Sequence, residues 1–285
     1  MSPPLNSALS AFSLAMLTRS AAEPTAKNFG VRPEGDISHL RPELIPDHDF
    51  LFAGFPCQPF SIIGNRDGFE DTRGTLFFEL AETIKAKRPT ALLLENVKQL
   101  LTHNQGKTLQ RILGVLRNLG YWTDYKVLNA LDFGLPQKRE RIFMVGLRGS
   151  TSQFKWPNKK RKIRPLSALL EKNPDARYYV SDRIRQARIA AHKATMKPAI
   201  WHENKAGNIS SHPFSCALRA GASYNYLLID GERRPTPREL LRLQGFPESF
   251  KMVCNDSQTR KQAGNAVPAP MVAAIIEAIL DGQED

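Results

Sequence analysis

A cysteine and a glutamate in the first half of the chain have side chains that could do chemistry together. Cys57 lies in GFPCQPFS (54–61), directly after a short apolar run and between two prolines, and Glu95 ends a second apolar run, ALLLE (91–95). A thiolate is a strong nucleophile, and a carboxyl group in a partly apolar site can hold or donate a proton. Such a pair suits the addition of a thiol to an electron-poor ring.

Other roles for these two residues are open at this point. Most cysteines are small buried hydrophobes, and a carboxylate at a strand end can be a helix cap or a surface group. The catalytic Cys–His pair of a thiol hydrolase is an alternative, although the six histidines show no local signature of one. A zinc site is disfavoured because Cys57, Cys216 and Cys254 lack metal-ligand spacing. We therefore expect no metal and interpret Cys216 and Cys254 as structural.

The hydrophobic pattern predicts the elements that must position Cys57 and Glu95. Apolar runs predict strands at 49–54, 91–95, 121–130 and 141–147, and apolar residues at helical spacing predict helices at 72–89 and 106–120. This alternation predicts an α/β domain with a largely parallel sheet. In such sheets, ligands collect at the C-terminal ends of the strands, where both Cys57 and Glu95 fall.

The charge of the chain points to a polyanionic partner. The chain has 285 residues with 40 Lys and Arg against 28 Asp and Glu, a net charge of +12, and residues 151–205 hold 14 of these cations against 4 acids. A solvated basic face or a flexible basic linker would look similar, although interspersed aromatics are unlike a purely disordered tail. The odd, widely spaced cysteines favour a reducing compartment. With no apolar run approaching a membrane span and no signal peptide, we expect a cytoplasmic protein without a membrane partner.

Five motifs carry a resemblance to a known family. They are GFPCQPFS (54–61), ENV (95–97), QKRERIF (137–143), RELLRLQGFP (238–247) and GNAVP (264–268). In this order and near this spacing they resemble the DNA (cytosine-5)-methyltransferases of bacterial restriction–modification systems. The resemblance covers roughly 28–148 and 234–280.

This resemblance implies a Rossmann-like, S-adenosylmethionine-dependent methyltransferase sheet with a smaller target-recognition domain. The expected divisions are a non-matching segment at 1–25, a catalytic α/β domain at 26–150, a basic target-recognition region at 151–235, and C-terminal helices at 236–285 that return to the catalytic domain.

The resemblance also implies roles for four catalytic residues. The Cys57 thiolate would add to carbon 6 of cytosine, while Glu95 contacts N3 and the exocyclic amine. Arg141 would contact the cytosine O2, and Arg139 would support the same pocket. Carbon 5 then takes a methyl group from S-adenosylmethionine. Because the thiol cannot reach a base inside a duplex, the target cytosine of double-stranded DNA would be flipped out.

The methyl donor has its own set of matching positions. By resemblance, Asp36 and Ile37 line the adenine pocket and Asn265 buttresses the cofactor side. The complete set expected to hold S-adenosylmethionine is Asp36, Ile37, Pro56, Leu76, Asn265 and Ala266.

The chain departs from the family pattern at its start. The family opens with a Gly-rich turn, Phe-x-Gly-x-Gly-Gly, and a second strand ending in an acid, whereas residues 1–25 contain no glycine. The resemblance therefore implies that the N-terminal strand is missing. A split enzyme completed by a separate N-terminal polypeptide, a misassigned start and a decayed copy are the open explanations. The alternative function is a non-catalytic DNA-binding relative that needs a complementing segment.

Overall fold

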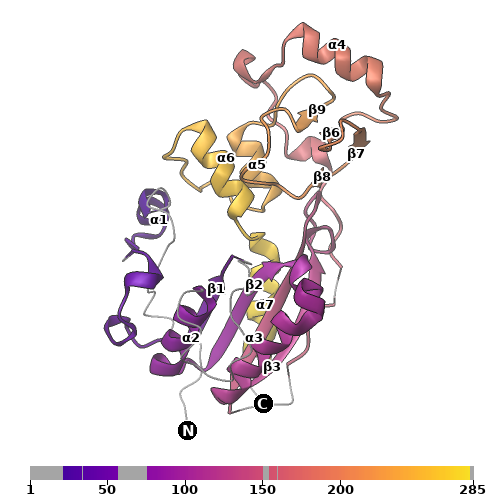
Figure 1. Ribbon diagram of the computed structural model, residues 1–285. Coiled ribbons are helices and arrows are strands. Elements are labelled where there is room, and N and C mark those ends of the chain that lie inside the picture. Colours follow the sequence, from indigo (N-terminus) through magenta and orange to yellow (C-terminus); the bar gives the residue numbers. More distant parts are fainter. Residues whose placement is uncertain (1–21, 34, 57–75, 150–153, 159, 283–285) are drawn as a thin grey trace. The chain divides into compact units, whose positions relative to one another are not determined.

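The computed structural model describes residues 22–33, 35–56, 76–149, 154–158 and 160–282 (Figure 1). The chain forms two compact units. The first consists of Met1–Leu128, Glu140–Pro157 and Ile275–Asp285, and the second of Asn129–Arg139 and Asn158–Ala274. The expected nucleophile, Cys57, lies outside the described residues. The domain boundaries expected from the motifs stay a prediction.

The first unit is built on a four-stranded sheet with the order β1-β2-β5-β3. Its strands are β1 (Phe50–Gly54), β2 (Ala91–Val97), β3 (Tyr121–Asn129) and β5 (Glu140–Arg148). Strands β1 and β2 are parallel, with Gly54 opposite Glu95. Among the described residues, β1 pairs only with β2. This register brings the end of β1, two residues before Pro56, beside Glu95.

The sheet is more mixed than its sequence pattern indicates. Strand β5 runs antiparallel to β2, with Glu95 opposite Phe143 and Val97 opposite Arg141. The expectation of a largely parallel sheet is therefore wrong for β5. Only residues 130–139 separate β3 from β5, and a parallel return needs a crossover of about a dozen residues or more. One consequence is functional, because the antiparallel start of β5 carries Arg141 to the same end of the sheet as Glu95.

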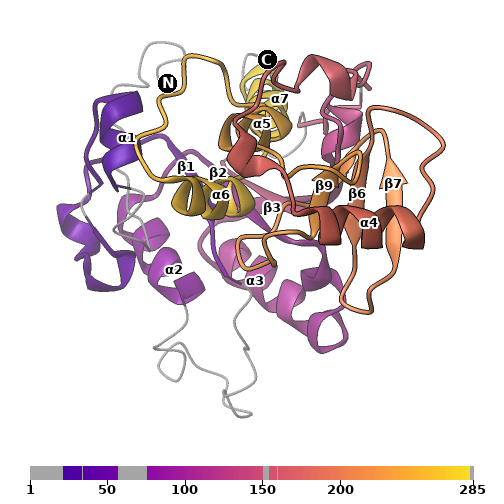
Figure 2. The same ribbon diagram turned by 90° about the horizontal axis from the view of Figure 1, so that it is seen from above.

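Helices cover the sheet of the first unit on both faces. They are α2 (Leu76–Lys87), α3 (Lys107–Asn118) and the end of α7 (Ala269–Asp281), while α1 (Ala22–Phe29) belongs to the same unit. Phe77 and Ile84 of α2 and Ile112 of α3 pack with Leu92 and Leu94 of β2 in one buried cluster. Figures 1 and 2 show α2 and α3 on one side of the sheet and the end of α7 on the other. Burial on both sides explains why β2 is almost entirely apolar before Glu95.

The described residues of the second unit form two small sheets, three complete α-helices and the start of a fourth. Strands β4 (Gln137–Lys138) and β8 (Ser215–Cys216) pair in parallel, and a three-stranded sheet has the order β7-β6-β9. The remaining elements are β6 (Ile200–Glu203), β7 (Ile209–His212), β9 (Leu227–Ile229), α4 (Asp182–Ala191), α5 (Pro237–Leu243) and α6 (Asp256–Asn265), with the start of α7.

A buried ion pair fixes the start of α5. Glu239 accepts hydrogen bonds from both terminal nitrogens of Arg233, at 2.8 and 2.7 Å, and its side chain is 1% exposed. The same carboxylate accepts from the backbone N–H groups of Thr236 and Glu171, each at 2.8 Å. The Thr236 hydroxyl in turn accepts from the Glu239 N–H, which completes a capping box. The charge of Glu239 is thus compensated by four donors.

We predict that Glu239→Ala destabilises the protein by about 3–5 kcal/mol, because it leaves the Arg233 charge buried and unpaired. A matched control is Glu248→Ala. The Arg242–Glu248 pair has the same sequence spacing, but the Glu248 side chain is 66% exposed, so its loss should cost less than about 1 kcal/mol. Urea unfolding measures both free energies, and equal losses would contradict this assignment.

One stretch passes as a membrane span by length and composition, which the sequence pattern had not led us to expect. It covers the 26 residues Asp256–Asp281. The stretch consists of two helices, α6 and α7, and Met271, Ile275 and Ile279 of α7 are at most 1% exposed. A helix of a soluble protein's core passes the same test, so the finding is weak evidence for a membrane.

Candidate active site

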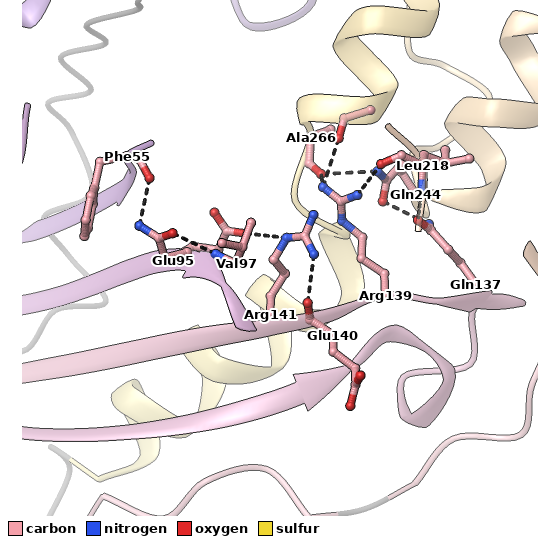
Figure 3. Close-up of polar contacts among 12 residues, drawn as sticks. Phe55, Glu95, Val97, Gln137, Arg139, Glu140, Arg141, Leu218, Gln244 and Ala266 are labelled. Carbon is pink, nitrogen blue, oxygen red and sulfur yellow. Dashed lines mark hydrogen bonds and ion pairs between the residues drawn. The ribbon is translucent and has the colours of Figure 1, made fainter. Parts of the chain in front are cut away.

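The backbone that leads to position 57 is anchored by a buried asparagine. Asn96 is 2% exposed, and its side-chain amide donates a 2.9 Å hydrogen bond to the carbonyl oxygen of Phe55 (Figure 3). Phe55 is itself buried, and its ring packs against that of Phe77 in a tilted arrangement with 5.5 Å between ring centres. Pro56 follows and is exposed. The backbone up to Pro56, the last described residue before Cys57, therefore has a fixed position.

Our sequence reasoning missed Asn96 as a functional residue. A signal was present, since Asn96 is a strictly polar side chain at the end of the apolar strand β2. A buried amide in such a place requires partners. Asn96 uses its nitrogen for Phe55 and its oxygen to accept from the N–H of Val97 at 2.8 Å.

Glu95 and Arg141 form a largely buried ion pair at the same end of the sheet. The Arg141 Nε lies 3.0 Å from Glu95 Oε1, and the two side chains are 15% and 12% exposed. Arg141 Nη1 also donates to the carbonyl oxygen of Glu140 at 2.8 Å (Figure 3). Burial lowers the pKa of Arg141 from its ordinary value, and the neighbouring Glu95 charge offsets part of this effect. The pair presents one carboxylate and one fixed guanidinium at the strand ends.

Gly54 makes room for the Glu95 carboxylate. A Cβ at this position would lie 3.1 Å from Glu95 Oε2, which is tighter than ordinary van der Waals contact. The glycine at the start of GFPC is therefore explained by a close approach rather than by backbone conformation. Its role became visible only with the register of β1 and β2.

If Glu95 has the catalytic role that the resemblance implies, Gly54→Ala should lower the rate of methyl transfer about 10- to 100-fold, because displacement of a catalytic group by a few tenths of an ångström to an ångström has effects of this size. Single-turnover kinetics at saturating DNA measures the change. Gly114→Ala in α3 is the matched control, since a Cβ there meets nothing within 4 Å. Equal rates for both variants would show that the Gly54–Glu95 contact has no catalytic consequence.

Arg139 is buried in the second unit, at 2% exposure. Its guanidinium donates to the carbonyl oxygens of Leu218 at 2.9 Å, Gly264 at 3.0 Å and Ala266 at 2.9 Å (Figure 3). Gln244 also donates to the carbonyl oxygen of Ala266, at 3.2 Å. These contacts fix the backbone on both sides of Asn265. Arg139 is therefore placed to position this segment.

Gly264 explains why this segment can pack so closely. A Cβ at Gly264 would lie 2.4 Å from the backbone nitrogen of Ala220, which is a prohibitive contact. The end of α6 thus lies directly against the backbone at residues 219–220. Asn265 is the last residue of α6 and is exposed. The backbone N–H of Ala266, which follows it, donates a hydrogen bond to the carbonyl oxygen of Gln262 at the end of the helix.

The expected adenine-binding residues lie in the first unit. Asp36 caps the 3-10 helix Ile37–His39, and its Oδ1 accepts from the N–H and the hydroxyl of Ser38 at 3.0 and 2.8 Å. These hydrogen bonds lower the pKa of Asp36, so the residue is an acceptor at neutral pH. Ile37 packs against the main hydrophobic cluster. A carboxylate beside an aliphatic side chain fits an adenine ring, which offers an amine donor and an apolar face.

The other expected cofactor residues are divided between the units. Pro56 and Leu76, the first residue of α2, belong to the first unit, whereas Asn265 and Ala266 belong to the second. Neither their contact with S-adenosylmethionine nor the catalytic roles of Cys57, Glu95, Arg139 and Arg141 is tested by the geometry alone. These assignments stay predictions.

Comparison with known sequences agrees with the motifs. The family model described as "C-5 cytosine-specific DNA methylase" matches residues 15–281. Type II methyltransferase M.NgoBI of Neisseria gonorrhoeae is 56% identical over 250 residues, covering 87% of this chain and 78% of the relative. Type II methyltransferase M.HaeII of Haemophilus aegyptius is 51% identical over 257 residues, covering 89% of this chain and 80% of the relative.

Solved structures share the fold. The Entamoeba histolytica methyltransferase EhMeth matches with a TM-score of 0.72 at 17% identity, covering 96% of this chain and 91% of that one. The Dnmt2 methyltransferase of S. pombe matches with a TM-score of 0.69 at 20% identity, covering 94% and 90%. The expected class of S-adenosylmethionine-dependent methyltransferase fold is thereby confirmed. The family match spans nearly the whole chain, and this protein belongs to the C-5 cytosine-specific DNA methylases.

Proposed function

We propose that this enzyme methylates carbon 5 of a flipped-out cytosine in double-stranded DNA through a covalent Cys57 adduct, as part of a restriction–modification system. Membership of the family and the names of the relatives support DNA cytosine methylation. The single observation that carries the mechanism is the Glu95–Arg141 pair beside the anchored backbone that leads to Cys57.

The chemistry requires activation of an unreactive carbon. Cys57 sulfur forms a bond to carbon 6 of cytosine, and the ring electrons move toward N3. Glu95, at the end of β2, would contact N3 and the exocyclic amine and favour the protonated form of N3. Carbon 5 then becomes enamine-like and nucleophilic. Covalent catalysis thus divides one difficult substitution into two feasible steps.

Arg141 would hold the other side of the ring. The Nε of Arg141 already pairs with Glu95. A guanidinium carries N–H donors and no acceptor atom, so the remaining donors of Arg141 suit the cytosine O2, which is an acceptor. The Glu95–Arg141 ion pair would hold the two side chains in positions from which both can contact the edge of the cytosine ring. Arg139 would act as a positioning residue, because it donates to three backbone carbonyls around Asn265.

S-adenosylmethionine, the methyl donor of this family, supplies an electrophilic methyl group when bound. Asp36 and Ile37 would hold its adenine, with Pro56, Leu76, Asn265 and Ala266 as further contacts. After transfer, carbon 5 loses its proton to a base and the sulfur–carbon 6 bond breaks. The aromatic ring and the free thiol of Cys57 are thereby restored.

The proposed activity is tested by incubating the purified chain with labelled S-adenosylmethionine and unmethylated genomic DNA. We expect label in the DNA, and bisulfite sequencing should locate it at cytosines within one short sequence. DNA that is bound but stays unlabelled would contradict the activity for the chain alone. Label that then appears on adding the part of M.NgoBI that lies outside the match would support the alternative, a DNA-binding chain that needs a complementing N-terminal polypeptide.

A further inference from the structure

Three arginines and two tyrosines of the second unit stack in alternation. The Arg260 guanidinium carbon lies 4.5 Å from the ring centre of Tyr224 and 5.5 Å from that of Tyr226. Arg234 lies 5.7 Å from the ring centre of Tyr224, and Arg219 lies 4.9 Å from that of Tyr226. In space the five residues follow the order Arg234, Tyr224, Arg260, Tyr226, Arg219, and together they are called the Arg–Tyr stack below.

The Arg–Tyr stack concentrates positive charge without acidic partners. Within the described part of the chain, no Asp or Glu forms an ion pair with Arg219, Arg234 or Arg260. Neighbouring arginines differ in this respect, since Arg177 pairs with Asp256 at 3.2 Å. Stacking on tyrosine faces stabilises the three cations, but their mutual repulsion persists. A bound anion would relieve it.

The hydrogen bonds that these arginines make to the protein use only some of their guanidinium N–H groups. Arg260 donates to the carbonyl oxygen of Ala222 at 2.9 Å, and Arg234 donates to that of Arg177. Arg219 is exposed, and among the described residues its guanidinium lies over the Tyr226 ring without forming a side-chain hydrogen bond. Tyr224, between two of these cations, is 53% exposed. A guanidinium that lies over a ring keeps its in-plane N–H groups available to an outside acceptor.

A cavity of about 170 Å³ opens beside the stack. Arg177, Arg234 and Arg260 line it together with three tyrosines. Its one carboxylate, Asp256, already accepts from the Tyr178 hydroxyl at 2.7 Å and pairs with Arg177. The lining therefore offers donors and positive charge to an incoming group.

We propose that the Arg–Tyr stack binds backbone phosphates of the DNA substrate, with Arg219 and Arg234 each contacting one phosphate and Arg260 holding the segment 222–226 between them. The inference rests on the proposed function, because it takes DNA as the substrate. Phosphate is favoured over a stacked base because the tyrosine rings already carry guanidiniums. A guanidinium can also read the acceptors of guanine, and that alternative would confine the loss of affinity to one DNA sequence.

The test measures DNA affinity against salt concentration for Arg219→Gln, Arg234→Gln and the double variant. Each phosphate contact contributes about −0.9 to the slope of log K against log salt. Each single change should therefore reduce the slope by about 0.9, and the double change by about 1.8. The losses should be the same for specific and for random DNA, and the rate of transfer at saturating DNA should be unchanged.

Two further variants keep the result interpretable. Arg148→Gln removes the same charge from an exposed residue at the opposite end of β5 from Arg141 and should leave the slope unchanged. Arg219→Lys keeps the charge and should restore the slope. A wild-type slope in the double variant would overturn the proposal, as would a loss confined to one DNA sequence. Wild-type protein is assayed first, and its failure to bind DNA would count against the proposed function itself.

Discussion

Replacing Cys57 by alanine should abolish methyl transfer while leaving DNA binding intact. Without the thiol, carbon 6 receives no nucleophile and carbon 5 stays unreactive. Removal of the nucleophile in other covalent enzymes lowers turnover by about 10⁴- to 10⁶-fold, and we expect a loss of that order. Transfer of labelled methyl groups measures the rate, and a gel-shift titration measures DNA affinity.

The two other thiols provide the matched controls for Cys57. Burial raises the pKa of Cys216 to about 11, so this thiol is protonated and unreactive at neutral pH. Cys254 is half-buried, and its Sγ accepts a hydrogen bond from the side-chain Nε2 of Gln262 at 3.6 Å. Cys216→Ala and Cys254→Ala should each keep methyl transfer within a few-fold of wild type. Loss of both transfer and DNA binding in Cys57→Ala would instead identify Cys57 as a residue needed for folding.

Glu95→Gln is expected to lower transfer about 10²- to 10⁴-fold, the usual contribution of a group that moves or holds a proton. Glutamine has nearly the same shape but bears no charge. It therefore removes the ionic partner of Arg141 and the group proposed to favour protonation of N3. Because Glu95 is proposed to contact only the flipped-out base, affinity for DNA in a gel-shift titration should change by no more than a few-fold.

Glu140→Gln is the matched control for Glu95→Gln. Glu140 precedes Arg141 in the chain, and its side chain pairs with Lys98 at 3.0 Å in an exposed setting. Its loss removes the same charge from the same region, yet transfer should stay within about twofold, since exposed pairs contribute little. If Glu95→Gln retained transfer at the level of Glu140→Gln, the proposed role of Glu95 would be wrong.

Local sequence patterns were sufficient to predict most elements of the first unit. The apolar periodicities at 72–89 and 106–120 correspond to α2 and α3, and the apolar runs at 49–54 and 91–95 correspond to β1 and β2. These elements are specified by residues close together in the chain, so a pattern reveals them. The rule that ligands and chemistry collect at the C-terminal ends of strands also predicted the location of the candidate site. In the structure the end of β1 does lie beside Glu95.

Features that depend on distant contacts were not predictable in this way. Arg139 reaches carbonyl groups 79 and 127 residues further along the chain, and no local pattern encodes such partners. The role of Gly54 depends on its register with Glu95, and the direction of β5 depends on the short connection that precedes it. The alternation in the Arg–Tyr stack joins residues 219–234 to α6, which is equally invisible in the sequence.

The most direct test of the covalent mechanism is to trap the adduct. DNA in which cytosine carries fluorine at carbon 5 is incubated with the protein and S-adenosylmethionine. Fluorine, unlike hydrogen, cannot leave carbon 5 as a positive ion, so the sulfur–carbon 6 bond cannot break after methyl transfer. We predict a protein–DNA complex that resists denaturation. Peptide mass spectrometry should locate the attachment of the DNA at Cys57. Methylation of ordinary DNA without any such complex, or attachment at another residue, would contradict the account.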